Sequence, residues 1–336
     1  MARVVDAVER DGMSALERPS VVRWGQSAYE TDEHLALEER TAKELGLSWK
    51  AYPTSSEPPD LTDVGALVVT SKVEVDASVL ARFEGSLVLT TTSGFDHIDR
   101  AAAVAQGIQV GRCPMARRDP VVEHSIGTLI GLLRRLPAQQ DAARAGRWAR
   151  GEVLGWTPVS LSDAKVLVVG LGVIGSRVAE LLGHFGVEVW GTDPVGVPAD
   201  VRAVDLDRAL PQVDAVTLHC SLNDTSRGLL SANRIGRLQP HAVIVNTARG
   251  ALLDVDAAVA AVRDQELGGL AVDVFPEEPW PGLENAARVP GVWLTPHASG
   301  VDRSLGARVA TEVGASLTAW AKGDPLPHPV SVSTSG

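Results

Sequence analysis

Three side chains of this 336-residue chain have the types that acid–base chemistry on a small organic acid requires: Arg249, Glu278 and His297. An arginine can form a fork onto carboxylate and carbonyl oxygens and stabilise charge that grows on them. A histidine can donate a proton to such an oxygen and take it back in the reverse direction. A glutamate beside the imidazole would orient it and favour its protonated form near neutral pH.

Each of these residues follows a segment with the pattern of a buried strand. Arg249 follows residues 242–246, Glu278 follows 269–273, and His297 follows 292–295. Ligands of an open parallel sheet bind outside the carboxyl ends of its strands. A lone arginine or histidine is more often a surface or packing residue, but three such residues at successive strand ends predict a reaction centre.

A glycine fingerprint predicts the second component of the site. An apolar, β-branched run at 166–169 is typical of a buried parallel strand, and Gly170, Gly172 and Gly175 follow it at G-x-G-x-x-G spacing. In such a fingerprint the first glycine permits a tight turn, the second lets a pyrophosphate approach the backbone, and the third lets the helix pack closely on the strand. The N–H groups near Val173 and Ile174 then form an anion site.

Asp193 completes this dinucleotide pattern. It follows a second strand at 187–191, where a carboxylate can accept hydrogen bonds from an adenosine ribose. The same carboxylate would repel a 2′-phosphate, and no arginine follows directly, so the sequence favours NAD over NADP. Together with Arg249 and His297, the fingerprint predicts hydride transfer between NADH and a 2-keto acid.

Composition narrows the class of protein. The formal charge of −11 argues against a general nucleic-acid binder, because phosphate contacts need a basic surface. No apolar run is long enough for a membrane span, and the N-terminus lacks the apolar stretch of a signal peptide. Cys113 and Cys220 form neither a disulfide framework nor a metal-ligand pattern. We expect a cytoplasmic enzyme without a metal.

Alternating strands and helices predict an α/β fold with two Rossmann-like, doubly wound parallel-sheet domains and a cleft between them. Strands are expected over 20–24, 66–70, 87–91, 108–111, 166–169, 187–191, 215–219, 242–246, 269–273 and 292–295. Helices are expected over 31–45, 76–83 and 304–322, and a long helix is expected to start at Asp119, with Asp119 as N-cap and Pro120 in the first helical position. Residues 1–18 are taken as an extension.

Ordered motifs give the chain a family resemblance. They are TSGFDHID at 92–99, VVEHSIGTLIGLLRR at 121–135, the fingerprint ending at Asp193, LHCSLNDT at 218–225, NTARG at 246–250, VDVFPEEP at 272–279 and TPHASG at 295–300. With these motifs the chain resembles the NAD-dependent D-isomer 2-hydroxyacid dehydrogenases. The resemblance implies a substrate-binding, flavodoxin-like domain of residues 1–114 plus 300–336 and an NAD-binding Rossmann domain of residues 115–299.

The resemblance also implies roles for individual residues. Arg249 would be the substrate arginine, His297 the acid/base and Glu278 its partner, while Asp273 would hold the nicotinamide amide. The expected cofactor contacts are Gly170, Gly172, Val173, Ile174, Gly175, Asp193, His219, Cys220, Ser221, Thr225, Thr247, Ala248 and Asp273. The expected substrate contacts are Ser71, Ser93, Gly94 and Arg249. The family's dimer interface implies a homodimer formed through the helix of 119–135, with Ile126, Leu129, Ile130, Leu133, Gly127 and Gly131 at the contact.

The substrate-selecting loops depart most from the family pattern. The first glycine of the family's G-x-G loop is Thr92 here, and the usual proline after the LHxx strand end is Ser221. Arg117 or Arg118, turned inward, would select a keto acid with a second anionic or strongly polar group. Turned outward, which we favour, they would leave Trp24 and Met115 to form an apolar pocket; Trp24 could equally pack the end of the first strand.

Two other functions use the same fold. Transcriptional corepressors that sense NADH share the complete triad, but the partner-binding clefts and longer tails of those proteins are not found here. Phosphite-oxidising relatives usually have a lysine near the position of Ser93, and this chain has none there. The favoured hypothesis is a 2-keto acid reductase; the identity of the keto acid stays open.

Overall fold

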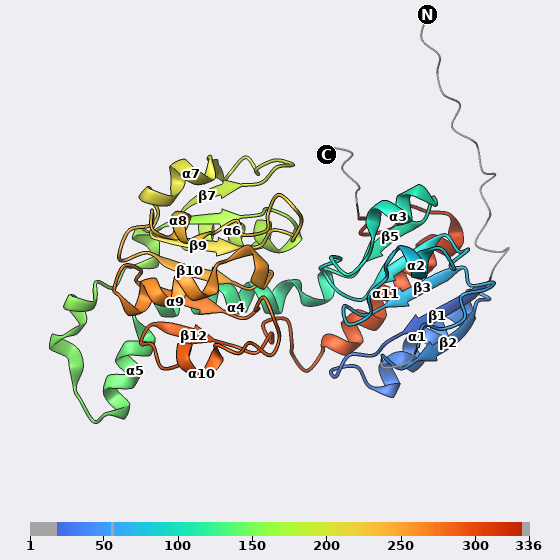
Figure 1. Ribbon diagram of the computed structural model, residues 1–336, viewed down its shortest axis with the longest axis horizontal. Helices are drawn as coiled ribbons and strands as arrows, with labels where there is room; N and C mark the ends of the chain where they lie inside the picture. Colours follow the sequence, from blue (N-terminus) through green and yellow to red (C-terminus); the bar gives the residue numbers. More distant parts are fainter. Residues whose placement is uncertain (1–18, 55–56, 331–336) are drawn as a thin grey trace, which may run out of the picture. The chain divides into compact units, whose positions relative to one another are not determined.

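The computed structural model describes residues 19–54 and 57–330 of the chain (Figure 1). The residues divide into two compact units. Unit 1 contains the residues up to Ala116 together with those from Arg303 onward, and unit 2 contains Arg117–Asp302. The expected N-terminal extension, residues 1–18, lies outside the described residues.

Unit 1 is built on a five-stranded parallel sheet with the order β2-β1-β3-β4-β5. Its strands are β1 (Ser20–Trp24), β2 (Ser48–Tyr52), β3 (Ala66–Val69), β4 (Leu87–Thr90) and β5 (Gln109–Arg112). The sequence patterns predicted each of these strands except β2. That strand is at the sheet edge and largely exposed, so it lacks the apolar run that marks the other strands.

Helices cover both faces of this sheet. They are α1 (Asp32–Glu44), α2 (Ala77–Leu80), α3 (Arg100–Ala105) and α11 (Leu305–Lys322). On one face, Val68 and Leu89 pack with Leu305, Val309 and Val313 of α11. The other face packs against α2 and α3. In Figure 1, α1 in blue and α11 in red lie together although they come from opposite ends of the sequence.

Unit 2 is built on a seven-stranded parallel sheet with the order β12-β11-β10-β9-β6-β7-β8. Its strands are β6 (Lys165–Val169), β7 (Glu188–Thr192), β8 (Arg202–Ala203), β9 (Ala215–Leu218), β10 (Val243–Asn246), β11 (Gly269–Val272) and β12 (Val292–Leu294). The order turns back on itself at β6 and β9, and ligands of doubly wound sheets bind at such a switch point. The two parallel α/β sheets confirm the predicted fold class.

The helices of unit 2 also lie on both sheet faces. They are α4 (Met115–Leu133), which begins at the boundary, α5 (Leu136–Arg144), α6 (Val173–His184), α7 (Leu206–Ala209), α8 (Ala232–Ile235), α9 (Val255–Arg263) and α10 (Leu283–Ala286). Short 3₁₀ turns occur at Ala149–Gly151, Val153–Trp156, Leu161–Asp163, Leu210–Gln212 and Gly250–Leu252. Helices α4 and α6 cover one face, and α7, α8 and α9 cover the other.

The predicted start of the long helix was wrong. Helix α4 begins at Met115, so Pro120 lies inside it and Asp119 does not cap it. The carboxylate of Glu312, on α11, accepts hydrogen bonds from the N–H groups of Met115 (3.1 Å) and Ala116 (2.8 Å). Pro120 has no N–H to give to the carbonyl of Ala116, and the side chain of Arg308 donates to that carbonyl instead (2.8 Å). Two side chains of α11 therefore provide hydrogen-bond partners for the first N–H groups of α4 and for the carbonyl that Pro120 leaves without a donor.

Part of the predicted dimer face of α4 lies inside unit 2, whereas Gly127 is exposed and Ile130 half-buried, and the dimer itself stays a prediction. Ile126, Leu129 and Leu133 are buried inside unit 2, where they pack against Val166 and Val168 of β6. A Cβ at Gly131 would lie 2.6 Å from the ring of Trp293, so this glycine makes room for a side chain of its own unit. The apolar periodicity of α4 correctly predicted a buried face. The sheet of unit 2 covers that face, however, and not a partner subunit.

Among the helices of the described residues, none combines the length and the apolar character that a membrane crossing requires.

Candidate active site

The fingerprint glycines between β6 and α6 are required by close contacts. Gly170 has a φ of +88°, and a Cβ there would lie 2.4 Å from the main-chain nitrogen of Cys220. A Cβ at Gly175 would lie 1.8 Å from the carbonyl oxygen of Gly170. Gly172, the exposed N-cap of α6, faces open space with no atom within 4 Å of such a Cβ. Two glycines thus hold the turn against the helix, and the third leaves the space that a pyrophosphate needs.

Asp193 is fixed to this glycine loop. Its carboxylate accepts hydrogen bonds from the N–H groups of Leu171 (2.8 Å) and Val195 (2.8 Å). One oxygen takes each bond, so both oxygens retain a lone pair for the hydroxyls of a ribose. The residues after β6 and β7 therefore fit a dinucleotide in both charge and space.

The segment after β9 supplies a neutral wall. The N–H of His219 donates to the carbonyl of Val169 (2.7 Å), and its Nε2 shares a hydrogen bond with the Thr217 hydroxyl (2.8 Å). Burial lowers the pKa of His219 to about 3 and raises the pKa of Cys220 to about 11, so both side chains are uncharged at neutral pH. Ser221 and Thr225, which follow, are exposed.

Arg249 lies in a turn held by a buried asparagine. Asn246 ends β10 and is fully buried; its Nδ2 donates to the carbonyl of Arg249 (2.9 Å), and its Oδ1 accepts from the N–H of Ala248 (3.1 Å). The hydroxyl of Thr247 shares a hydrogen bond with Ser125 of α4 (2.9 Å). These bonds fix the base of the turn, and Nη1 of Arg249 donates a hydrogen bond to the carbonyl of Ala248 (2.8 Å). The sequence motif contained Asn246, but its positioning role was not predicted.

Gly250 brings the arginine turn onto the loop that carries the glutamate. A Cβ at Gly250 would lie 1.9 Å from the carbonyl carbon of Phe275. The two loops touch through their backbones, and no larger residue fits there without moving one of them. The rings of Phe275 and Trp280 stack with centroids 5.2 Å apart, which stiffens the second loop.

The structure pairs Glu278 with His297. The imidazole Nδ1 lies 2.7 Å from the carboxylate Oε2 of Glu278, whose Oε1 accepts a hydrogen bond from the N–H of Phe275 (3.0 Å). The side chain of His297 is 52% exposed, so its Nε2 is on the accessible part of an anchored ring. This arrangement can present one proton at Nε2 and hold the ring still as the proton moves.

Asp273, which follows β11, holds the loop that contains His297. It is 1% exposed, and its carboxylate accepts from the hydroxyl of Thr295 (2.6 Å) and from the N–H groups of Ala298 (2.8 Å) and Ser299 (3.0 Å). Its carbonyl accepts from the N–H of His297 (2.7 Å), which has a φ of +53°. The predicted contact of Asp273 with a nicotinamide amide stays a prediction. The support that Asp273 gives to the loop of His297 was not predicted, because the sequence pattern does not show which residues contact this carboxylate.

The predicted substrate residues of unit 1 follow its strands. Ser71 is exposed after β3, and Ser93 and Gly94 lie in the loop after β4. Within the described residues, the structure gives the N–H groups of Ser93 and Gly94 no acceptor, so they are available to a ligand. Trp24 is 5% exposed and packs in the core with Leu61, so it fills the end of β1 and does not form an apolar wall.

The arginines at the start of α4 have contacts in unit 2. The guanidinium of Arg118 forms two hydrogen bonds with the carboxylate of Asp119, at 2.7 and 3.2 Å. The stem of Arg117 lies beside Gly300, where a Cβ would be 3.2 Å from the arginine Cδ. Arg118 therefore already has a counter-ion.

Comparison with known proteins identifies the family. The sequence model of the D-isomer specific 2-hydroxyacid dehydrogenase, NAD binding domain, matches residues 126–299, just over half of the chain. A glyoxylate reductase of Thermofilum pendens is 30% identical over 294 residues, covering 83% of this chain and 85% of that protein. A D-3-phosphoglycerate dehydrogenase of Mycobacterium bovis is 30% identical over 279 residues, covering 80% of this chain and 52% of that protein. This chain thus spans about half the length of the second relative.

A solved structure has the same fold over nearly the whole chain. The glyoxylate reductase of Paecilomyes thermophila superposes with a TM-score of 0.79 at 25% identity, covering 93% of this chain and 98% of that chain. The cofactor is NAD(H), for which the glycine turn and Asp193 provide space and charge. The chain is an oxidoreductase that acts on hydroxy acids, and it belongs to the D-isomer specific 2-hydroxyacid dehydrogenase family.

Proposed function

We propose that the chain works mainly as an NADH-dependent reductase of a small 2-keto acid. The observation that carries this proposal is the 2.7 Å contact between His297 and Glu278, which leaves the imidazole Nε2 as a proton donor. Bound NADH supplies the hydride. His297 donates the proton that the carbonyl oxygen takes up, and the carboxylate of Glu278 holds the ring in place while the proton moves.

Arg249 and the unit 1 loop have complementary roles in this proposal. The Arg249 guanidinium stabilises the charge that develops on the carbonyl oxygen, and its turn is held still by Asn246. The N–H groups of Ser93 and Gly94 take the substrate carboxylate, as main-chain donors without an internal acceptor can do. A glyoxylate reductase is among the relatives at 30% identity, so glyoxylate is the first substrate to test.

The test is NADH oxidation followed at 340 nm with glyoxylate, and then with NADPH. Asp193 presents a carboxylate where a 2′-phosphate would have to lie, so kcat/KM with NADH should exceed that with NADPH by at least about tenfold. Asp193→Ala should narrow the gap. No reduction of glyoxylate or of other 2-keto acids would refute the reductase; equal efficiency with both cofactors would refute only the NAD preference.

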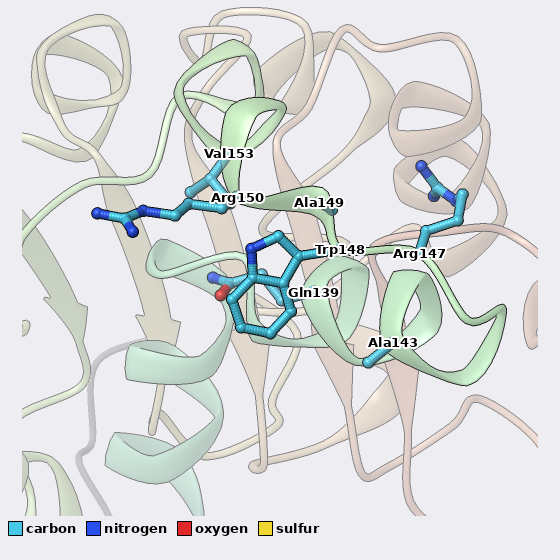
Figure 2. Close-up of a pocket in the computed structure, with 7 residues that line it drawn as sticks. All are labelled: Gln139, Ala143, Arg147, Trp148, Ala149, Arg150 and Val153. Carbon is cyan, nitrogen blue, oxygen red and sulfur yellow. The ribbon is translucent and has the colours of Figure 1, made fainter.

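We also propose a homodimer. In the segment after α5, Trp148 is 90% exposed and Leu154 is 86% exposed. Trp148 and Val153 line a pocket of about 280 Å³ together with Gln139 and Arg150, and Figure 2 shows the indole at its centre. Exposed apolar side chains that gather in one patch often form an interaction surface on a soluble protein.

Sedimentation at micromolar concentration tests the assembly. The expected species has twice the 35.4 kDa chain mass, and Trp148→Ser should shift it toward the monomer. Phe185→Ser, at a residue that is 53% exposed on another part of unit 2, is the matched control and should leave the dimer intact. A 35.4 kDa species alone would rule the dimer out.

A further inference from the structure

The carboxyl edge of the unit 1 sheet contains buried polar atoms without a hydrogen-bond partner. They include Nε1 of Trp24 at the end of β1, Oγ1 of Thr70 after β3 and Nε of Arg112 at the end of β5. Buried polar atoms are nearly always bonded in proteins, so an unpaired one indicates a missing partner such as a ligand or water. Only the arginine among these carries a charge.

Arg112 lies directly against the loop proposed to bind the substrate carboxylate. Its Nη1 donates a hydrogen bond to the carbonyl of Ser93 (3.2 Å), and its guanidinium lies 5.7 Å from the centre of the Phe95 ring. The guanidinium of Arg112 therefore lies beside Ser93. Within the described residues, the N–H groups of Ser93 and Gly94 have no hydrogen-bond acceptor.

No carboxylate within the described residues forms an ion pair with Arg112. The nearest acid that influences it is Glu312, whose two oxygens accept the N–H groups of Met115 and Ala116 at the start of α4. Burial lowers the pKa of Arg112 and Glu312 opposes this effect, but an arginine keeps its charge in either case. The guanidinium is thus a partly buried cation whose remaining donors face no acid of their own.

We propose that Arg112 determines specificity by binding a second carboxylate at the far end of the substrate, so that the enzyme prefers dicarboxylic 2-keto acids. This proposal rests on the proposed reductase function and on the role of the Ser93–Gly94 loop. Arg112 and that loop belong to the same unit, so one small molecule can reach both. Among the described residues Nη2 of Arg112 has no hydrogen-bond partner, and unlike Nε it is not closed off from solvent. A carboxylate can accept from Nη2, whereas an apolar substrate end would leave this donor unpaired.

The other cations of this region have different contacts. Arg118 is paired with Asp119, and Lys72 is exposed after β3. Arg100 lies over the same ring as Arg112, 5.3 Å from the centre of Phe95, but no hydrogen bond joins it to Ser93. Arg100 is therefore the matched control for charge near the loop.

The experiment compares two substrates of nearly equal shape. Oxaloacetate ends in a carboxylate where 4-methyl-2-oxopentanoate ends in an isopropyl group. For the wild-type enzyme with NADH, kcat/KM should favour oxaloacetate by at least about tenfold. Arg112→Gln should lower this ratio by about 10- to 100-fold, the effect of removing a charged hydrogen-bond partner. Arg112→Lys retains the charge without the fork and should lower it less.

Arg100→Gln should leave the ratio unchanged. A role of Arg112 in the shape of the loop alone would reduce both substrates equally, so an unchanged ratio in Arg112→Gln overturns the proposal, as does a wild-type preference for the isopropyl substrate. If Arg112→Gln does not fold, the proposal is tested on the wild-type enzyme by measuring how strongly malonate and 3-methylbutanoate inhibit glyoxylate reduction. Malonate must then inhibit at least tenfold more strongly than 3-methylbutanoate, and equal inhibition would overturn the proposal. Activity with glyoxylate tests the reductase separately.

Discussion

The carboxyl edges of the two sheets are built in opposite ways. In unit 2 the carboxylates at this edge already have hydrogen-bond partners within the unit. The carboxylate of Asp273 accepts three hydrogen bonds and that of Asp193 accepts two. The carboxylate of Glu278 contacts both His297 and a main-chain N–H. In unit 1 the edge retains buried polar atoms without partners, and Arg112 has no counter-ion among the described residues. Catalysis needs groups fixed before the substrate arrives, whereas recognition needs donors that the substrate itself completes.

Removing the proton donor should have the largest effect. His297→Ala leaves Glu278 without its partner and the carbonyl oxygen without an acid, so turnover with glyoxylate should fall by roughly 10²–10⁴. The matched change at the unit 1 edge is Ser93→Ala, which retains both main-chain N–H groups and should cost less than about tenfold. If His297→Ala and Ser93→Ala lost equal activity, the proposed contrast between the fixed carboxyl edge of unit 2 and the incompletely bonded edge of unit 1 would be wrong.

Overfilling the glycine turn should come next. A Cβ at Gly175 would lie 1.8 Å from a carbonyl oxygen, so Gly175→Ala should weaken NADH binding by about 2 kcal/mol, or roughly 30-fold. Gly183 is in the same helix and has no neighbour within 4 Å of a Cβ, so Gly183→Ala should bind NADH normally and unfold at a slightly higher temperature. Fluorescence titration measures both, and normal binding by Gly175→Ala would contradict the turn geometry.

A buried charge cluster tests the interior of unit 1. Arg23 is fully buried and pairs with Glu30 (2.7 Å) and Glu38 (3.1 Å), and burial raises the pKa of Glu38 to about 7, with Arg23 opposing the shift. A carboxyl whose pKa rises on folding stabilises the fold below about pH 4.5, and this contribution is lost as the pH rises through 7. Relative to wild type, Glu38→Gln should therefore gain about 2–3 kcal/mol between pH 5 and pH 8.

Urea unfolding at the two pH values measures this difference. Glu30→Gln is the control: it removes the charge that pairs with Arg23 and faces the N–H of Ser27, so it should destabilise the fold at both pH values. A Glu38→Gln variant whose stability follows that of the wild type at every pH would show that this carboxyl does not titrate in the range.

The smallest expected effect comes from Glu278→Gln. The amide oxygen can still accept a hydrogen bond from Nδ1 of His297, so the ring stays in place, but a neutral acceptor binds an N–H less strongly than a carboxylate does. Turnover with glyoxylate should therefore fall by about fivefold, the equivalent of roughly 1 kcal/mol. Steady-state rates at saturating NADH measure this. A loss as large as that of His297→Ala would show that the carboxylate itself is essential.

The sequence predicted most of what local patterns determine. The β-branched runs and the glycine spacing located β6 and the turn after it, and the strand ends identified Arg249, Glu278 and His297, of which the structure pairs the last two. These features depend on residues near one another in the chain.

The predictions that failed concern features that depend on residues far apart in the sequence. An N-cap aspartate followed by proline is a sound local signal, yet α4 starts earlier because Glu312 and Arg308, nearly 200 residues later, satisfy its first turn. The apolar face of α4 was recognised but assigned to a partner, since periodicity shows that a face is buried and not what covers it. The support that Asp273 gives to the histidine loop was missed for the same reason.

The place of α11 in unit 1 has a consequence for synthesis. One face of the first sheet packs on Leu305, Val309, Val313, Leu317 and Trp320, all of which follow unit 2 in the sequence. Every residue of unit 2 is translated before this helix is, so unit 2 can fold while the older sheet still exposes an apolar face. The first sheet is thus completed only after unit 2 has been synthesised, and a chaperone that shields the sheet would act on the part of the nascent chain that precedes unit 2.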